Sequence, residues 1–358
     1  MIHFLLKPPP KTKFSTTSFV TINRLPFLIL FLALTLSACA PTPQDCAKAN
    51  VFCAGLVTAS GSVSDNGINQ QAWFGLQDAK AAGLVDRIDY IETVDSRDRA
   101  KNIEFFAENG YDVIITVGSS LSDGTIAAAQ KYPNLKFIGV EQEQTEKYPN
   151  VAGLVFHEDQ SGFMAGALAA MITQTNHVGA VCEAKFIDAM RRYCDGFRAG
   201  VLYINPNIDV MLAYRDGSQE KLFNDPGWGT AAASQMVNDG ADIIFAAGGG
   251  TADAALETAA HDGMYVIGSE TDVYARLTGI RSQLVSSAVS DVRSGVRDLM
   301  RLARSGQLPS GDYFGQTGLA PFHDLENQIS PGVVEKLNTI QSGLKNSSIQ
   351  TGIPYINP

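Results

Sequence analysis

Polar and acidic side chains gather where predicted strands end. In open α/β sheets, ligands bind beyond the carboxyl ends of the strands, where backbone N–H groups and helix N-termini are free. Hydroxyls, amides and carboxylates in this arrangement are typical of a site for a ligand with several hydroxyl groups. The candidate ligand-binding residues that follow these strands are Asp65, Asn69, Trp73, Ser119, Glu141, Gly249, Glu270 and Asp272.

Phe223 is a further candidate because it lies in a polar segment between Leu222 and Pro226. A phenylalanine of the core is less expected there, and an aromatic ring in a polar loop can stack on a flat base.

These candidates also have simpler structural interpretations. Ser64, Asp65 and Asn66 can cap the helix that begins near residue 68. The glycines at 248–250 can form an ordinary tight turn, and Trp73 can belong to the core. The sequence leaves these alternatives open.

No pattern of a catalytic, metal or cofactor site is present. The five histidines have neither metal-ligand nor catalytic spacing, and the chain contains no Gly-x-Ser-x-Gly or HExxH motif. The segment 248–251, Gly-Gly-Gly-Thr, is neither a Walker motif nor a dinucleotide-binding fingerprint. We therefore predict no catalytic residue, no metal and no cofactor.

Strands and helices alternate along most of the chain, which indicates βαβ units and parallel sheets. The predicted strands lie near 54–59, 88–94, 112–117, 135–140, 151–156, 177–182, 208–214, 242–247 and 264–268. The predicted helices cover 68–82, 98–109, 123–132, 160–173, 188–203, 229–239, 252–261, 283–304 and 331–344.

About nine strands exceed one doubly wound domain, so we expect two similar lobes. The chain has 358 residues, which also fits two domains. The predicted division places 53–157 plus about 272–306 in lobe 1, and 158–271 plus about 307–358 in lobe 2.

The N-terminus has the pattern of a lipoprotein signal peptide over residues 1–38. Basic residues precede a short apolar run from Leu25 to Leu36, which then meets Leu36-Ser37-Ala38-Cys39. This run is too short to span a bilayer permanently. We therefore expect lipidation of Cys39, a tether over 39–52, and a location on the outer face of the cell membrane. The alternative is an ordinary signal peptide with an incidental cysteine.

The charge of the chain excludes nucleic acid as a partner. The formal net charge is −10, and no cluster of basic residues follows residue 24. Residues 1–38 contain four basic and no acidic side chains, so their removal leaves a formal charge of −14. An acidic protein does not adhere to anionic lipid by charge, so acyl chains must hold it at the membrane.

Four cysteines remain if Cys39 is acylated, and an even number in an oxidising compartment suggests two disulfides. Three pairings are possible, and buried free thiols are the alternative. Proximity in sequence favours Cys46–Cys53 and Cys182–Cys194.

The segment from Gly61 to Gly75 resembles the opening signature of the basic membrane protein family. These proteins are lipid-anchored substrate-binding proteins of ABC importers, and they include purine nucleoside receptors. The signature reads Gly-Thr-Ile-Asp-Asp-Lys-Ser-Phe-Asn-Gln-x-x-Trp-x-Gly, and further motifs follow in the family's order over roughly 53–345. The matching positions are Gly61, Asp65, Asn69, Gln70, Trp73, Gly75, Gly196-Phe197, Ala199-Gly200, Phe223-Asn224-Asp225-Pro226, Ala247-Gly248-Gly249 and Ile267-Gly268.

The resemblance implies a type I periplasmic-binding fold, with two doubly wound lobes, three crossovers and a ligand between them. It also implies that aromatic rings sandwich a purine while amide and acidic side chains hold the base and ribose. The residues this carries over are Asn69, Trp73, Glu141, Phe223, Gly249 and Glu270, with Asp272 nearby.

The chain departs from the family pattern at several of these positions. Ser64 and Ile68 replace an aspartate and a phenylalanine, and Glu141 and Glu270 stand where aspartates are expected. Ser290 replaces a lysine. A glutamate still accepts hydrogen bonds from hydroxyl groups, although one methylene further out. The departures raise the alternative that the ligand is not a standard purine nucleoside.

The sequence therefore predicts a monomeric solute-binding protein that works with an ABC permease and ATPase. One alternative is a receptor that senses the same ligand without transport. Another is an enzyme such as a nucleoside hydrolase, but only Asp65 of the required aspartate cluster is present.

Overall fold

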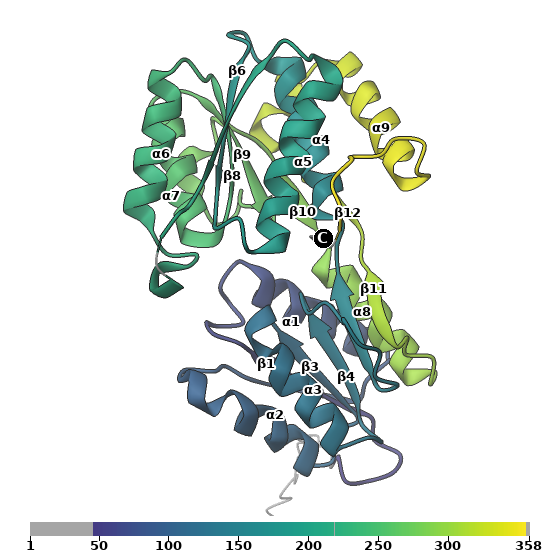
Figure 1. The fold of residues 1–358 in the computed structure, drawn as a ribbon. Coiled ribbons are helices and arrows are strands. Elements are labelled where there is room, and N and C mark those ends of the chain that lie inside the picture. The colour runs from purple at the N-terminus through teal and green to yellow at the C-terminus, as the bar shows by residue number, and fades with distance from the viewer. Residues whose placement is uncertain (1–45, 218, 356–358) are drawn as a thin grey trace, which may run out of the picture. The chain divides into compact units, whose positions relative to one another are not determined.

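The computed structural model describes residues 46–217 and 219–355. Cys39 and the predicted signal peptide over 1–38 lie outside these residues. The described chain forms two six-stranded sheets, with the orders β11-β5-β4-β3-β1-β2 and β12-β10-β9-β8-β6-β7 (Figure 1). Each position in the first order has a counterpart in the second, so the predicted pair of similar α/β lobes is confirmed.

All strand pairs of the first sheet are parallel, and in the second sheet only β12 runs antiparallel to its neighbour β10. The strands of the first sheet are β1 Cys53–Thr58, β2 Arg87–Ile91, β3 Val113–Val117, β4 Lys136–Val140, β5 Val151–Val155 and β11 Gly311–Phe314. Those of the second sheet are β6 His177–Cys182, β7 Asp209–Tyr214, β8 Ile243–Ala247, β9 Tyr265–Glu270, β10 Leu284–Ser290 and β12 Thr317–Leu319.

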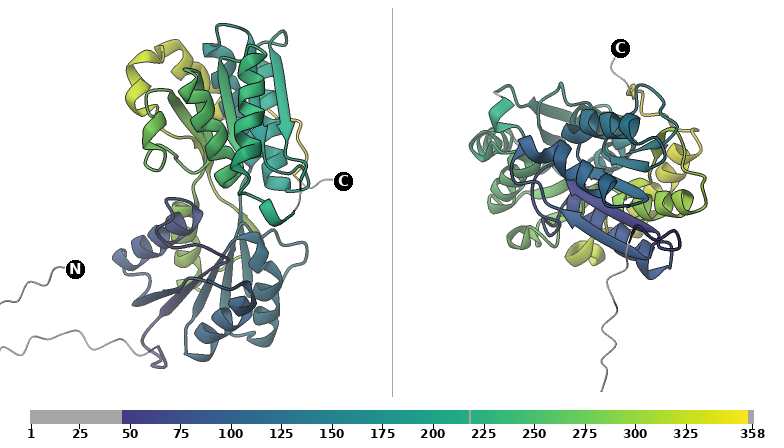
Figure 2. Two further views of the ribbon diagram at one scale, coloured as in Figure 1. Left: turned by 90° about the vertical axis from the view of Figure 1, so that its left-hand side faces the viewer. Right: turned by 90° about the horizontal axis from the view of Figure 1, so that it is seen from below.

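Helices cover both faces of each sheet, which explains why the central strands read as continuous apolar runs. The first sheet packs against α1 Ile68–Ala81 and α8 Val292–Arg304 on one face, and against α2 Arg99–Glu108 and α3 Ser122–Lys131 on the other. The second sheet packs against α4 Glu158–Ile172, α5 Asp188–Ile204 and α9 Pro331–Lys345 on one face, and against α6 Pro226–Asn238 and α7 Gly249–His261 on the other. Figure 2 shows these layers from two further directions.

The described chain passes between the two sheets three times. It leaves the first sheet after β5 through α4, returns after β10 through α8 to β11, and crosses again from β11 to β12. The first crossing helix, α4, packs closely on α5. A Cβ atom on Gly166 would overlap the carbonyl oxygen of Phe197, and one on Gly200 would overlap that of Phe163. The two helices therefore approach to backbone contact, which only glycine permits at these positions.

One predicted element is wrong. The sequence predicts a single amphipathic helix over 283–304, but the structure has strand β10 followed by α8. Asp291 separates the two elements, and its side chain accepts a hydrogen bond from the Ser294 N–H at 3.0 Å. This is an N-cap, which marks where a helix begins. The seven residues before it, Leu-Val-Ser-Ser-Ala-Val-Ser, are almost all buried and form the strand.

The strands also divide between the sheets differently from the predicted lobe boundaries. β10 joins the second sheet although 272–306 was expected in lobe 1, and β11 joins the first sheet although 307–358 was expected in lobe 2. Both differences arise because the chain crosses between the sheets immediately after β10 and again after β11. A division of 53–157 plus 291–314 and 158–290 plus 315–355 follows the sheets.

The structure contains the two disulfides favoured by sequence proximity. Cys46 is bonded to Cys53, and Cys182 is bonded to Cys194. Within the described residues, no group of three or more His, Cys, Asp or Glu side chains is placed to hold a metal ion. None of the helices over 46–217 and 219–355 has the length and apolar character needed to cross a membrane.

Candidate functional site

Two cavities adjoin Glu270 at the carboxyl end of β9. The first cavity, of about 280 Å³, takes its lining from both sheets and their helices. The second cavity, of about 310 Å³, lies between the start of α1 and the first turn of α7. The first is lined by Ser119, Ser122, Glu141, Glu143, Val155, Glu158, Ile187, Asp188, Ala189, Met190, Arg192, Phe223 and Glu270. The second includes Asp65, Ile68, Gly249, Asp253, Glu270 and Arg276.

Two glutamates from strand ends line the first cavity. Burial, together with the nearby carboxylates of Glu270 and Glu158, raises the pKa of Glu141 to about 8. Burial also raises the pKa of Glu270, although the N–H groups of Gly249 and Gly248 donate to its Oε1 at 3.4 and 3.1 Å and oppose the shift. A carboxyl group that holds its proton near neutral pH can both donate and accept hydrogen bonds. The cavity therefore offers both kinds of partner to a hydroxyl group.

Arg192 brings a positive charge to the first cavity from near the start of α5. Its Nε lies 2.6 Å from Glu158 Oε2, and its Nη2 lies 2.7 Å from Glu143 Oε1. The side chain is only 2% exposed, so these are charge-assisted hydrogen bonds in a largely dry environment. Two carboxylates face this one cation, and its charge is thereby offset.

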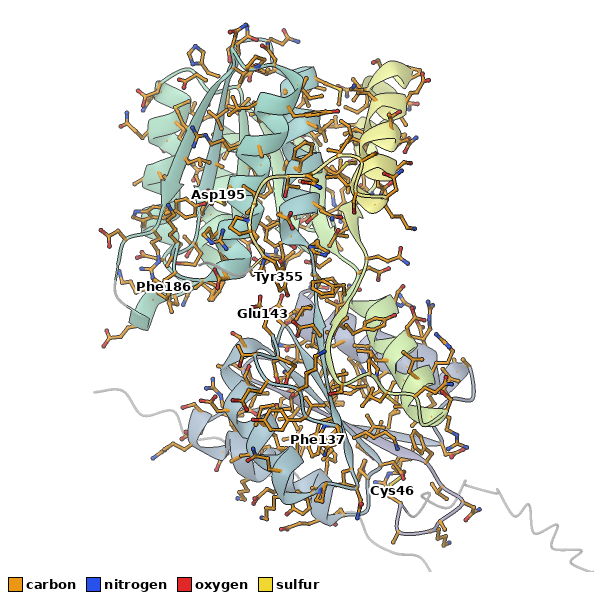
Figure 3. The ribbon with its side chains drawn as sticks, turned by 45° about the vertical axis from the view of Figure 1, so that its right-hand side comes forward. Cys46, Phe137, Glu143, Phe186, Asp195 and Tyr355 are labelled. Carbon is orange, nitrogen blue, oxygen red and sulfur yellow. A yellow bond between two sulfur atoms is a disulfide. The ribbon has the colours of Figure 1, made fainter. Side chains whose placement is uncertain are left out.

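The C-terminal segment completes the surroundings of Arg192. Arg192 Nη1 donates to the carbonyl oxygen of Tyr355 at 2.7 Å, and its guanidinium lies 4.4 Å from the centre of the Tyr355 ring. Figure 3 shows Tyr355 and Glu143 near one another, and both residues contact Arg192. The sequence pattern did not predict Arg192, Glu143 or Glu158, because none of them directly follows a strand.

The structure brings several predicted residues together. Ser119, Glu141, Phe223 and Glu270 line the first cavity, and Asp65, Gly249 and Glu270 line the second. Phe223 is 38% exposed, so a ligand has access to its ring. Residues predicted from their position after strands and Phe223, predicted from its polar loop, therefore lie around the same cavity.

Three predicted residues do not line either cavity. The amide nitrogen of Asn69 donates to the Ser60 carbonyl at 3.0 Å and to Asp65 at 2.9 Å. Trp73 packs against the core of the first sheet, with its ring 4.9 Å from that of Tyr90. Asp272 accepts from the Tyr274 N–H at 3.1 Å and pairs with His323 at 2.7 Å. The polar groups of Asn69 and Asp272 and the ring of Trp73 therefore make their contacts within the protein.

Asp65 has a structural role beside its position in the second cavity. Its Oδ1 accepts hydrogen bonds from the N–H groups of Gly67 at 2.7 Å and Gln70 at 3.1 Å. N–H groups at the start of a helix have no acceptor within the helix itself. Asp65 supplies that acceptor for α1 and so acts as the cap that the simpler interpretation proposed. Ser290, which replaces the family's lysine, lies outside both cavities and pairs with the Tyr193 hydroxyl at 2.9 Å.

Known proteins resemble this chain over most of its length. A family model described as ABC transporter substrate-binding protein PnrA-like matches residues 53–347. A CD4+ T-cell-stimulating antigen of Listeria monocytogenes is 26% identical over 348 residues, which cover 90% of this chain and 96% of that protein. An ABC transporter nucleoside-binding protein, BmpA, of Lactococcus lactis is 28% identical over 279 residues, which cover 72% and 76% of the two chains.

A solved structure of an ABC transporter solute-binding protein from Conexibacter woesei superposes with a TM-score of 0.70. It is 19% identical and covers 85% of this chain and 99% of that one. Together with the two equivalent sheets, this likeness shows a type I periplasmic-binding fold.

Proposed function

This chain belongs to the PnrA-like substrate-binding proteins of ABC transporters, and on that premise we propose that it binds a purine nucleoside or a closely related polyhydroxylated solute. The observation that carries the proposal is the first cavity, where Glu141 and Glu270 from the two sheets lie with the ring of Phe223. The carboxyl groups suit hydroxyl groups of a sugar, and the ring suits stacking on a base. The nucleoside-binding relative from Lactococcus lactis supports this ligand class.

The charge around the first cavity favours a neutral ligand over a phosphorylated one. Arg192 is the cation of its lining, and its charge is offset by Glu143 and Glu158. Because this cation is already paired, it has no free charge to offer a phosphate, and any carboxylate of the lining that is ionised repels one more strongly in a low-dielectric cavity than in water. A nucleoside monophosphate therefore binds more weakly than its nucleoside.

We further propose that Cys39 carries acyl chains and that the protein works at the outer face of the membrane. A permease and an ATPase of an ABC importer then accept the solute, and the binding protein acts as a monomer without catalysing a reaction. The segment Leu36-Ser37-Ala38-Cys39 at the end of the predicted signal peptide and the family membership support this assignment.

Isothermal titration with guanosine, inosine, adenosine, guanine and guanosine monophosphate tests the ligand class. We expect nucleosides to bind more tightly than guanine, because the carboxyl groups serve the sugar, and more tightly than the monophosphate. Tighter binding of the monophosphate would contradict the charge argument. Binding of none of the five would contradict the nucleoside assignment, and mass spectrometry of small molecules released from the purified protein would then identify the cargo.

A further inference from the structure

Glu183 is a fully buried carboxylate next to the first cavity, at the end of β6. Its Oε1 accepts hydrogen bonds from the Ala184 N–H at 3.0 Å and from Arg215 Nε. Its Oε2 accepts from the Phe223 N–H at 2.9 Å and from the Thr251 hydroxyl at 3.1 Å. One side chain thus joins β6 to the loop between β7 and α6 and to the first turn of α7.

The contact with Phe223 matters because of the backbone of that residue. Phe223 has a φ of 61°, in the left-handed region that bulky residues seldom adopt. Both of its backbone polar groups are held: the N–H by Glu183 and the carbonyl oxygen by the Gly250 N–H at 2.8 Å. Strained conformations persist where the surroundings fix them, and they are common at ligand sites.

We propose that Glu183 is a positioning residue for ligand binding, which holds Phe223 in the conformation that places its ring in the first cavity. This inference rests on the proposed role of Phe223 as a stacking platform. A buried carboxylate suits the task because it has only acceptors, and here every contacting group is a donor. The same side chain reaches Thr251 in α7, the helix whose first N–H groups contact Glu270.

The variant Glu183→Gln keeps the shape of the side chain but places an NH₂ group among donors. The local test is hydrogen–deuterium exchange over residues 219–225 in the absence of ligand. We expect exchange at Phe223 to rise about tenfold, since its N–H loses a charged acceptor. Thr251→Val, which removes one partner of Glu183 and keeps the carboxylate, should change the same amides in the same direction by a smaller factor.

Asp242→Asn is the matched control for this experiment. Asp242 lies at the other end of the second sheet, immediately before β8, and accepts hydrogen bonds from the Thr173 hydroxyl and the N–H groups of Gln174 and Thr175 at 2.6, 2.6 and 3.0 Å. Its substitution should destabilise the protein without altering exchange over 219–225. Equal exchange in the wild type and in both Glu183→Gln and Thr251→Val would overturn the inference, whatever the ligand.

A double-mutant cycle with guanosine tests the link to binding. We expect Glu183→Gln to weaken guanosine binding about tenfold in the wild-type background and less than about twofold in a Phe223→Ala background. Equal effects in both backgrounds would show that Glu183 does not act through Phe223. If the wild type does not bind guanosine, the proposed function fails, while the exchange experiment still decides the role of Glu183.

Discussion

Glu141 and Glu270 are equivalent residues of the two sheets. Each stands at the carboxyl end of the third strand from one edge, β4 in the first sheet and β9 in the second. Each also has a left-handed backbone, with φ values of 58° and 68°. The two lobes therefore use the same local geometry to bring a carboxyl group to the first cavity.

Stability should fall with rising pH because of Glu141. Its pKa is about 8 in the folded protein and has an ordinary value of 4.5, so the folded chain holds a proton that the unfolded chain releases. The contribution of this group is complete below pH 4.5 and is lost as the pH rises to about 8. Glu141→Gln removes the titration. One pKa unit corresponds to about 1.4 kcal/mol. Between about pH 5 and about pH 9, the wild type should therefore lose about 1.4 kcal/mol or more of its free energy of unfolding that Glu141→Gln does not lose.

Denaturant titrations at these two pH values measure the difference in the free energy of unfolding. Glu146→Gln is the control, because it removes an exposed carboxylate from the same loop. A pH dependence that is the same in the wild type and in Glu141→Gln would contradict the prediction.

Removal of Arg192 should destabilise the protein strongly. Arg192→Met leaves Glu158 buried without its cation, and such a change costs about 3–5 kcal/mol in the free energy of unfolding. The double variant Arg192→Met/Glu158→Gln should recover part of that loss, because no uncompensated charge remains at this position. Urea denaturation of the three proteins gives the comparison. A double variant less stable than Arg192→Met would argue against charge burial as the cause.

The ring of Phe223 should contribute most of the stacking energy for a base. Stacking on an aromatic ring is worth about 1–3 kcal/mol, so Phe223→Ala should weaken guanosine binding by about tenfold to a hundredfold. Phe105→Ala, which removes an exposed ring from α2, controls for the loss of surface aromatic area. A loss of affinity in Trp73→Ala as large as that in Phe223→Ala would instead support the clamp of two rings that the family resemblance implies.

The bond between Cys182 and Cys194 should stabilise the protein modestly. The two cysteines are 12 positions apart. On the loop-closure model, a bond that closes a loop of that size lowers the entropy of the unfolded chain and raises the free energy of unfolding by about 2–3 kcal/mol. Cys182→Ala/Cys194→Ala should lower the free energy of unfolding by that amount. Peptide mapping without reductant checks the pairing, and a peptide that joins Cys46 to Cys194 would refute it.

Replacement of the lipidation site should release the protein from the membrane. Cys39→Ser removes the thiol that acyl transfer needs, so the variant should appear in the soluble fraction of fractionated cells. The wild type should remain with the membranes after a carbonate wash. Retention of the variant after the same wash would show that something other than Cys39 provides the anchor.

Residues that directly follow buried strands could be predicted from the sequence. Glu141 comes directly after the predicted strand 135–140 and Glu270 two residues after the predicted strand 264–268, and the rule for parallel sheets places both at a ligand edge. Glu183 carries the same signal, since it follows the predicted strand 177–182. Its role depends on partners in two distant segments, and no periodicity links them in one sequence.

Residues that reach the site from helices could not be predicted in this way. Arg192 lies near the start of α5, and an arginine in a helix is normally a solvated surface residue. Only the packing of α5 against α4 and the C-terminal segment makes it a buried ion-pair partner. The helix predicted over 283–304 failed for a related reason, because the boundary at Asp291 depends on a cap rather than on hydrophobic spacing.

The three crossings between the sheets also constrain the order in which the chain can fold. The first sheet obtains five of its six described strands from residues 53–155, but α8 and β11 follow only after residue 290. A chain that emerges amino end first therefore exposes the apolar face that α8 covers, including the surroundings of Leu76 and Leu154, until most of the second lobe has been synthesised. Each lobe takes elements from two separate stretches of the chain, so truncation before α8 should leave both lobes without a complete core.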